Sequence, residues 1–186
     1  IDVIGKEPGI VTTLEESGYS RISQEDYMMI LDHAEVGPGY LPAHGHADTL
    51  SIECSIGSER LIVNSGTSIY GVSAERLRQR QTRAHSTVVV DNSDSSEVWS
   101  GFRVARRAKA LLEKIEESGS DVFISASHDG YLRLKGRVVH TRSVASKPKE
   151  FTVYDELNGC RDDAYVIYHL HPDVGVEVLG DAKVTL

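Results

Sequence analysis

Short runs rich in valine, isoleucine, threonine and tyrosine recur along the chain, separated by clusters of glycine, asparagine, aspartate or serine. Apolar and polar positions alternate within these runs, which is typical of strands that bury one face. Turn dipeptides such as Asp129-Gly130 and Asn158-Gly159 lie between them. Strands are expected over residues 19–22, 27–33, 49–56, 60–63, 86–91, 122–127, 137–144, 151–157, 165–171 and 175–179. The spacing predicts an all-β chain folded as a large antiparallel β-sandwich.

One stretch, residues 104–117, gives two conflicting signals. It is rich in alanine, leucine, lysine and glutamate, so propensity alone predicts a helix. The apolar residues at positions 102, 104, 108, 110 and 112, however, share one parity, as they would in a half-buried strand. Because the flanking runs are strands, we predict a strand here and a turn at residues 119–121.

The two ends of the sequence differ from its middle. Residues 1–16 show little periodicity, whereas residues 182–186 resemble a strand that is cut short. The chain also begins with Ile1 rather than methionine. We therefore expect an excised piece of a longer protein. Residues 1–16 would be a linker or the end of a missing N-terminal domain, and residues 17–186 one sandwich domain truncated at its C-terminus.

Composition narrows the classes of partner. The chain has 28 acidic and 20 basic residues, and its net charge of −8 argues against nucleic acid as a partner. No run approaches the roughly 18 apolar residues that a membrane span needs, so none is expected. The two cysteines, Cys54 and Cys160, provide neither a disulfide framework nor a zinc ribbon.

The basic residues are unevenly distributed. Between positions 76 and 109 there are eight arginines and lysines and three acidic residues. A basic zone on an acidic protein suits an anionic ligand, but basic side chains also protect solvated strand edges. Both interpretations remain open from composition alone.

The stretch AHGHADTLS at residues 43–51 places two imidazoles, His44 and His46, one residue apart. In an extended strand residues i and i+2 point to the same face, so the rings can converge on one metal ion or one substrate. The alternative is a loop histidine beside a histidine that hydrogen-bonds to the backbone.

Three pieces of sequence, GHADTLS at 45–51, LIVNSGT at 61–67 and RQTRAHSTVVVD at 80–91, follow one another with characteristic order and spacing. Together they resemble the heparinase II/III family of polysaccharide lyases, which includes related oligoalginate lyases. The resemblance spans roughly residues 17–108 and includes LHPD at 170–173 farther on. It implies an N-terminal helical toroid followed by a C-terminal antiparallel β-sandwich, and this chain is similar to the second domain.

The resemblance implies a structural zinc ion held by His46, Asn64 and His85. Two neutral imidazoles and one oxygen ligand, with a water, complete a tetrahedral zinc site. The family usually has aspartate where this chain has Asn64, and an amide oxygen is a neutral, weaker ligand. The alternative is a hydrogen-bonded cluster without metal.

The resemblance also makes His44 the catalytic candidate in a β-elimination that cleaves an acidic, uronic-acid-containing polysaccharide. Most of the family's other active-site groups come from the toroid, so we expect this chain alone to be inactive. The family usually has a further tyrosine in a loop that corresponds to residues 75–82 here; this stretch has none, and the nearest is Tyr70. Arg78 and Arg80 in that loop are candidates to grip a sugar carboxylate or sulfate in bidentate fashion.

Two other functions remain alternatives. A cupin-like metalloprotein also carries a His-x-His motif, but its glutamate follows after three or four residues, whereas six residues separate His46 from Glu53. A non-catalytic carbohydrate-binding or lid module is the second alternative, favoured by Asn64 and the missing tyrosine. Metal analysis would distinguish the cupin, since iron or manganese would favour it. A lyase assay would distinguish the binding module.

Overall fold

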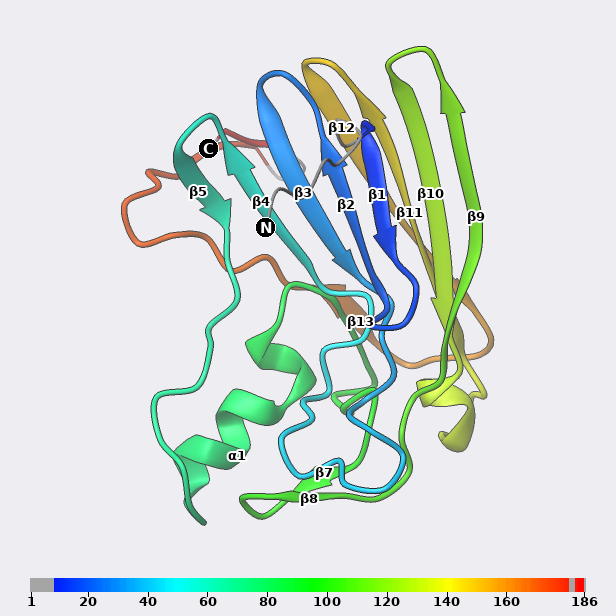
Figure 1. Cartoon of the computed structure of the whole chain (residues 1–186). Helices are drawn as coiled ribbons and strands as arrows, with labels where there is room; N and C mark the ends of the chain where they lie inside the picture. The colour runs from blue at the N-terminus through cyan, green and yellow to red at the C-terminus, as the bar shows by residue number, and fades with distance from the viewer. Residues whose placement is uncertain (1–8, 181–182, 186) are drawn as a thin grey trace, which may run out of the picture.

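The computed structural model describes residues 9–180 and 183–185, in which two antiparallel sheets pack face to face (Figure 1). The first sheet contains, in spatial order, β1 (Val11–Leu14), β2 (Tyr19–Ser23), β3 (Tyr27–Asp32), β4 (Ile52–Ile56) and β5 (Glu59–Ile62). The second contains β12 (Glu150–Asn158), β11 (Val139–Lys147), β10 (Asp121–His128) and β9 (Ala110–Ser118). Strands that follow one another in sequence are neighbours in both sheets. The predicted antiparallel β-sandwich is confirmed.

Alternating side chains from the two sheets meet in one apolar core. In β3, Met29 and Leu31 are fully buried, whereas Met28 between the inward positions is exposed. Ile124 of β10 and Val144 of β11 face them from the second sheet in the same cluster. Full burial of one such side chain contributes about 1.5–3 kcal/mol, so this alternation is what selects the fold.

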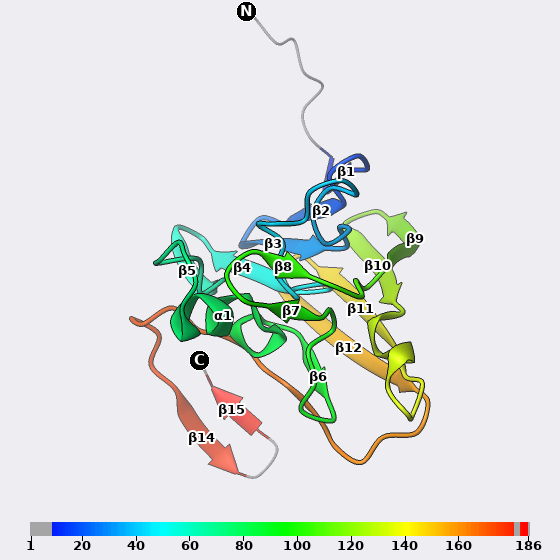
Figure 2. The same cartoon turned by 90° about the horizontal axis from the view of Figure 1, so that it is seen from below.

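Shorter elements cover one end of the sandwich, as Figure 2 shows from below. They are α1 (Ala74–Arg80), the 3₁₀ turns Thr82–Ala84 and Gly130–Arg133, β6 (Val88–Val90), β7 (Val98–Trp99), β8 (Arg103–Val104) and β13 (Ala164–Val166). β6 pairs with β13, β7 with β8, and β14 (Glu177–Gly180) with β15 (Lys183–Thr185). No described helix is long and apolar enough to cross a membrane.

β9 confirms the strand predicted within residues 104–117. Leu112 pairs with Ala126 of β10, and after a bulge Ile115 pairs with Ile124. The extra residue of the bulge reverses which positions face inward. This reversal explains why the apolar residues of this stretch share one parity only as far as position 112.

Two segments differ from the expectations. Val11–Leu14, expected within a linker, forms β1 and pairs with β2 through a turn at Gly18, which has a φ of 71°. Residues 1–8 of that expected linker lie outside the described residues. Residues 75–82, expected as a loop, instead contain most of α1. Its N-terminus is capped by Ser73, whose hydroxyl accepts a hydrogen bond from the Arg76 amide at 3.1 Å.

Candidate active site

The two histidines of the His-Gly-His motif lie in the irregular loop between β3 and β4, not in a strand. A Cβ on Gly45 would lie 2.9 Å from the Val36 side chain, so only glycine fits between them. His44 is exposed and makes edge contacts with the rings of Tyr70 and Phe102, each with a centroid distance of 5.9 Å. His46 instead faces inward, so the two rings do not converge as a strand would make them.

Arg80 holds this loop against the end of α1. Its side chain is fully buried, and Nε and Nη2 donate to the Gly45 carbonyl at 3.1 and 2.9 Å. Nη1 and Nη2 also donate to the carbonyls of Ser100 and Arg103 at 3.3 and 3.2 Å. In return, the Ala47 amide donates to the Arg80 carbonyl at 2.9 Å. In contrast to the expectation from the sequence, Arg80 is therefore a structural residue, out of reach of a sugar.

His85 enters the site from the 3₁₀ turn Thr82–Ala84. The amide of His85 donates to the Thr82 carbonyl at 3.0 Å, and the Thr82 amide is held by the Asp94 carboxylate at 2.8 Å. This turn directs the fully buried ring of His85 toward His46, with a centroid distance of 5.2 Å. A residue 39 positions away in sequence therefore meets the histidine motif.

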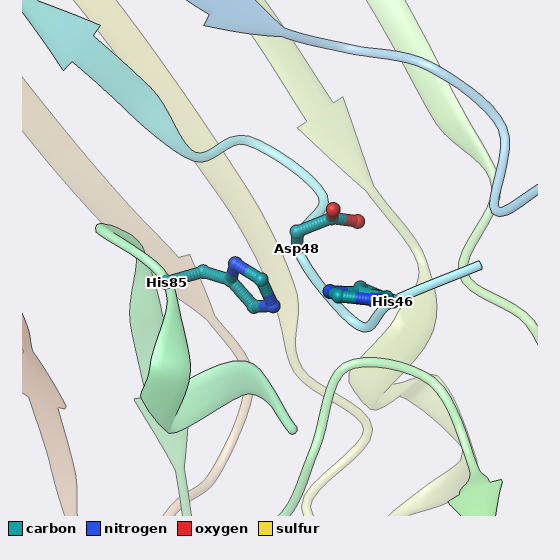
Figure 3. A group of neighbouring side chains, drawn as sticks. All are labelled: His46, Asp48 and His85. Carbon is teal, nitrogen blue, oxygen red and sulfur yellow. The ribbon is translucent and has the colours of Figure 1, made fainter. Parts of the chain in front are cut away.

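His46, Asp48 and His85 form the cluster drawn in Figure 3, with one ligating atom from each lying within 4.8 Å of the others. Within residues 9–180 and 183–185, neither ring nitrogen of His85 has a well-aligned hydrogen-bond partner, although both are buried. Buried polar atoms are nearly always satisfied, so a buried imidazole with no such partner is available to bind a metal ion. Two nitrogens and one oxygen are the donor set of a zinc site that keeps one position for water.

The protonation of the two histidines fits a metal. Burial, reinforced by the neighbouring His169, lowers the pKa of His85 to about 4; the nearby Gln79 carbonyl opposes this shift in part. Burial and the adjacent His85 lower the pKa of His46 to about 4, against the opposing effect of Asp48. Both rings are therefore neutral at pH 7, the form that binds metals. Burial raises the pKa of Asp48, and a bound cation would favour its ionised form.

Arg76 is a buried cation without a salt-bridge partner in the described part of the chain. It is 1% exposed, and Nη1 donates to His46 Nε2 at 3.2 Å and to Thr67 Oγ1 at 2.9 Å. Among the described residues, its Nε also has no hydrogen-bond partner. The guanidinium lies 5.4 Å from the centroid of Tyr70 and 5.9 Å from that of Phe102. A buried charge usually has a counter-charge, so this position suits an anionic group on a ligand.

A cavity of about 540 Å³ opens beside this cluster. His44, His46, Asp48 and Asn64 all line it. The Asn64 side-chain oxygen accepts a hydrogen bond from the Gly66 amide at 3.0 Å. Asn64 thus borders the same space as His46 and Asp48, and its role as a zinc ligand remains a prediction.

The other two predicted substrate residues lie on the surface near α1. Tyr70 is 67% exposed and contacts His44. Arg78 is exposed and makes a bidentate pair with Glu75 at 2.7 and 2.8 Å, so its guanidinium already has a carboxylate partner. Asp48 and Arg76 were not selected from the sequence. A helical pattern could have identified Arg76, since Arg76, Gln79 and Arg80 form the buried side of α1.

Comparison with known proteins gives two results. Residues 7–186 match the family described as heparinase II/III-like, C-terminal. Similar solved structures include the heparan sulfate lyase HepC from Pedobacter heparinus, with 22% identity and a TM-score of 0.71 over 93% of this chain and 26% of that one. The heparinase III BT4657 gene product gives 20% identity and a TM-score of 0.70 over 91% and 25%. No curated protein sequence matches significantly. This chain spans about a quarter of the structures that it matches, which share its fold.

Proposed function

Because this chain belongs to the heparinase II/III-like C-terminal family, we propose that it is the β-sandwich domain of a polysaccharide lyase acting on a uronic-acid-containing polysaccharide. The observation that carries this proposal is a juxtaposition in one cavity. The metal-competent cluster of His46, Asp48 and His85 lies beside the exposed imidazole of His44. A sandwich built only for packing would have no need of an orphaned, buried histidine at this position.

The proposed reaction is β-elimination. A base removes the proton from C5, next to the sugar carboxylate, and that electron pair forms the C4=C5 bond. The C4–O4 bond breaks, and the departing O4 takes a proton. His44 is the proposed base, because its ring is exposed at the cavity and oriented by Tyr70 and Phe102. Tyr70, whose ring contacts that of His44, is proposed to donate its hydroxyl proton to O4.

We propose zinc as the ion held by His46, Asp48 and His85, with Asn64 as the alternative oxygen ligand. A bound zinc ion supplies fixed positive charge and ties the β3–β4 loop to the segment that carries His85. Nε2 of His46 accepts a hydrogen bond from Arg76, so the neutral ring carries its proton on Nδ1, and metal binding at either nitrogen would displace the Arg76 hydrogen bond. His44 lies two residues from His46 in the same loop, so the zinc ion would also help to fix the position of His44.

We propose that the substrate carboxylate binds on the side of the site nearest to the Arg76 guanidinium. The Arg76 guanidinium, which forms no ion pair with any described residue, lies beside Tyr70 and Phe102 and would attract an anionic sugar toward His44. Two matched variants test this role of Arg76. Arg76→Gln is expected to weaken binding of an acidic oligosaccharide, whereas Arg78→Gln, which breaks only an exposed pair, leaves it unchanged. Isothermal titration measures both, and equal effects would contradict the assignment.

The lyase assay tests the proposal as a whole. Alginate and heparan sulfate fragments are incubated with the longest protein that contains this chain, and ultraviolet absorbance follows the new C4=C5 bond. We expect product from that protein, loss of product in His44→Ala, and no turnover by the 186-residue chain alone, where the cavity is open and Tyr70 exposed. Binding without product in the longer protein would instead support a non-catalytic carbohydrate-binding module.

A further inference from the structure

The inward-facing side chains of the second sheet change from apolar to polar toward the candidate site. In β11 the inward residues run from Val144 in the core to Arg142 and His140 at the end nearest the site, and both of these are fully buried. Arg142 pairs across the sheet with Asp155 of β12, and His140 with His128 of β10. Three of these polar side chains, His128, His140 and Arg142, are buried in the sandwich interior, and the partly exposed carboxylate of Asp155 on the edge strand β12 completes the patch.

These four side chains form a directed hydrogen-bond chain. The Gly130 amide donates to His128 Nδ1 at 3.1 Å, so Nε2 carries the proton and donates to His140 Nδ1 at 3.2 Å. His140 Nε2 then donates to Asp155 Oδ1 at 2.7 Å. Burial alone would raise the pKa of Asp155, but hydrogen bonds from His140 and Arg142 lower it to about 2. The carboxylate is thus a fixed anion.

Arg142 uses both sides of its guanidinium. Nε and Nη2 donate to the two carboxylate oxygens of Asp155 at 2.8 and 3.0 Å. Nη1 donates to the carbonyls of Leu50 and Ser86 at 2.8 and 2.7 Å. Leu50 lies two residues after Asp48, and Ser86 follows His85 directly. One buried nitrogen therefore joins the two segments that carry the metal cluster.

The contact with Leu50 holds a strained residue. Leu50 has a φ of 63°, a left-handed conformation that is unfavourable for a residue with a Cβ. Such strain persists only when surrounding contacts enforce it. The Leu50 amide donates to the Asp32 carbonyl at 2.8 Å, while Arg142 binds its carbonyl. Because Leu50 sets the course of the chain leaving Asp48, its conformation fixes where that carboxylate points.

We propose that Arg142, held by Asp155 and the His128–His140 pair, is a positioning residue that sets the distance between Asp48 and His85. The expected effect of Arg142 on zinc affinity rests on the proposed metal site. Its expected effect on the backbone at Leu50 and Ser86 does not. Lysine cannot replace Arg142, because a single ammonium cannot bind a carboxylate in bidentate fashion and also reach two carbonyls.

The experiment compares Arg142→Lys with Val144→Ala in the 186-residue chain. Val144 is the next inward residue of β11 and is also fully buried, so its truncation lowers stability without touching Leu50 or Ser86. Zinc affinity is measured by competition with a chromophoric chelator, well below the melting temperature of each variant. We expect Arg142→Lys to weaken zinc binding roughly 10- to 100-fold, the usual effect of losing a residue that orients ligands. Val144→Ala should leave it unchanged.

A metal-free measurement separates this inference from the metal site itself. Amide hydrogen exchange is recorded for Leu50 and for Ile52, whose amide donates to the Ser86 carbonyl at 3.3 Å. Arg142→Lys is expected to accelerate exchange at both amides beyond what its loss of global stability explains. In Val144→Ala, all core amides should change together.

Each outcome has a distinct meaning. If the unmodified chain binds no zinc, the metal proposal fails. Faster local exchange in Arg142→Lys would still support the role of Arg142 in holding the backbone at Leu50 and Ser86. If exchange at Leu50 and Ile52 merely follows global stability, Arg142 is structural only and the inference is overturned. Should Arg142→Lys not fold, Asp155→Asn, which keeps the shape of the partner and removes its charge, is expected to show the same effects in weaker form.

Discussion

The two ends of the sandwich bury very different side chains with the same strand geometry. At the core end, Ile124 and Val144 meet Met29 and Leu31 of the facing sheet. At the other end, the next inward position of β11 is Arg142, and its charge is matched by Asp155. Strand alternation therefore decides which residues lie inside, but not whether they are apolar. An apolar interior stabilises the fold as a whole. Buried polar side chains with hydrogen-bond partners instead hold particular backbone segments in one conformation.

The largest expected effect comes from the core end. Ile124→Ala removes a fully buried aliphatic side chain, and such truncations cost about 2–5 kcal/mol because of lost transfer free energy and the cavity left behind. We expect this loss in the free energy of unfolding, measured by urea denaturation, with zinc affinity unchanged. A large loss of zinc affinity in this variant would mean that the two ends are not separable.

His46→Ala tests the site end. Zinc present at about 100 times its Kd adds about 2.7 kcal/mol of stability, and this variant should lose that increment together with its bound metal. Thermal unfolding with and without chelator, paired with metal analysis, measures both quantities. An unchanged melting temperature with full metal content would remove His46 from the ligand set.

Acid should weaken the site end selectively. Burial first, and His169 second, lower the pKa of His85 from 6.5 to about 4, so the unfolded chain binds this proton more tightly than the folded one. In metal-free protein the free energy of unfolding should therefore fall as the pH drops from 6.5 to 4, by at most about 1.4 kcal/mol per pH unit for this one group. The fall should be shallower in His85→Gln. Identical pH profiles for the two proteins would contradict the assignment.

The smallest expected effect distinguishes the two candidate oxygen ligands. Asp48→Asn should weaken zinc binding about tenfold and at the same time stabilise the metal-free protein, because burial disfavours the charged carboxylate. Asn64→Asp should leave zinc affinity unchanged if Asp48 is the oxygen ligand. Tighter binding by Asn64→Asp would assign the ligand to position 64, as the family resemblance implies.

The sequence predicted the sandwich well because alternation is a local signal, and it identified the strand in residues 104–117 against helix propensity. It did not predict α1, which is only seven residues long and rich in arginine. Treating that stretch as a loop led to Arg78 and Arg80 as ligands of the substrate, whereas spacing along a helix buries Arg76 and Arg80 and exposes Arg78. Asp48 was overlooked because the family pattern directs attention to Asn64. Its closeness to His85 depends on the turn Thr82–Ala84 and on Leu50, which no periodicity reveals.

The grip of Arg80 on Gly45 also bears on how this protein can change over evolutionary time. It anchors the base of the β3–β4 loop, where Gly45 admits no side chain. The tip of the same loop carries Tyr40 and Leu41, which are 89% and 59% exposed and line the cavity beside His44. If the proposed lyase function is correct, substitutions at the tip would alter which sugar chain enters, while the histidines keep their places. New specificities would then arise here without changes to the catalytic residues.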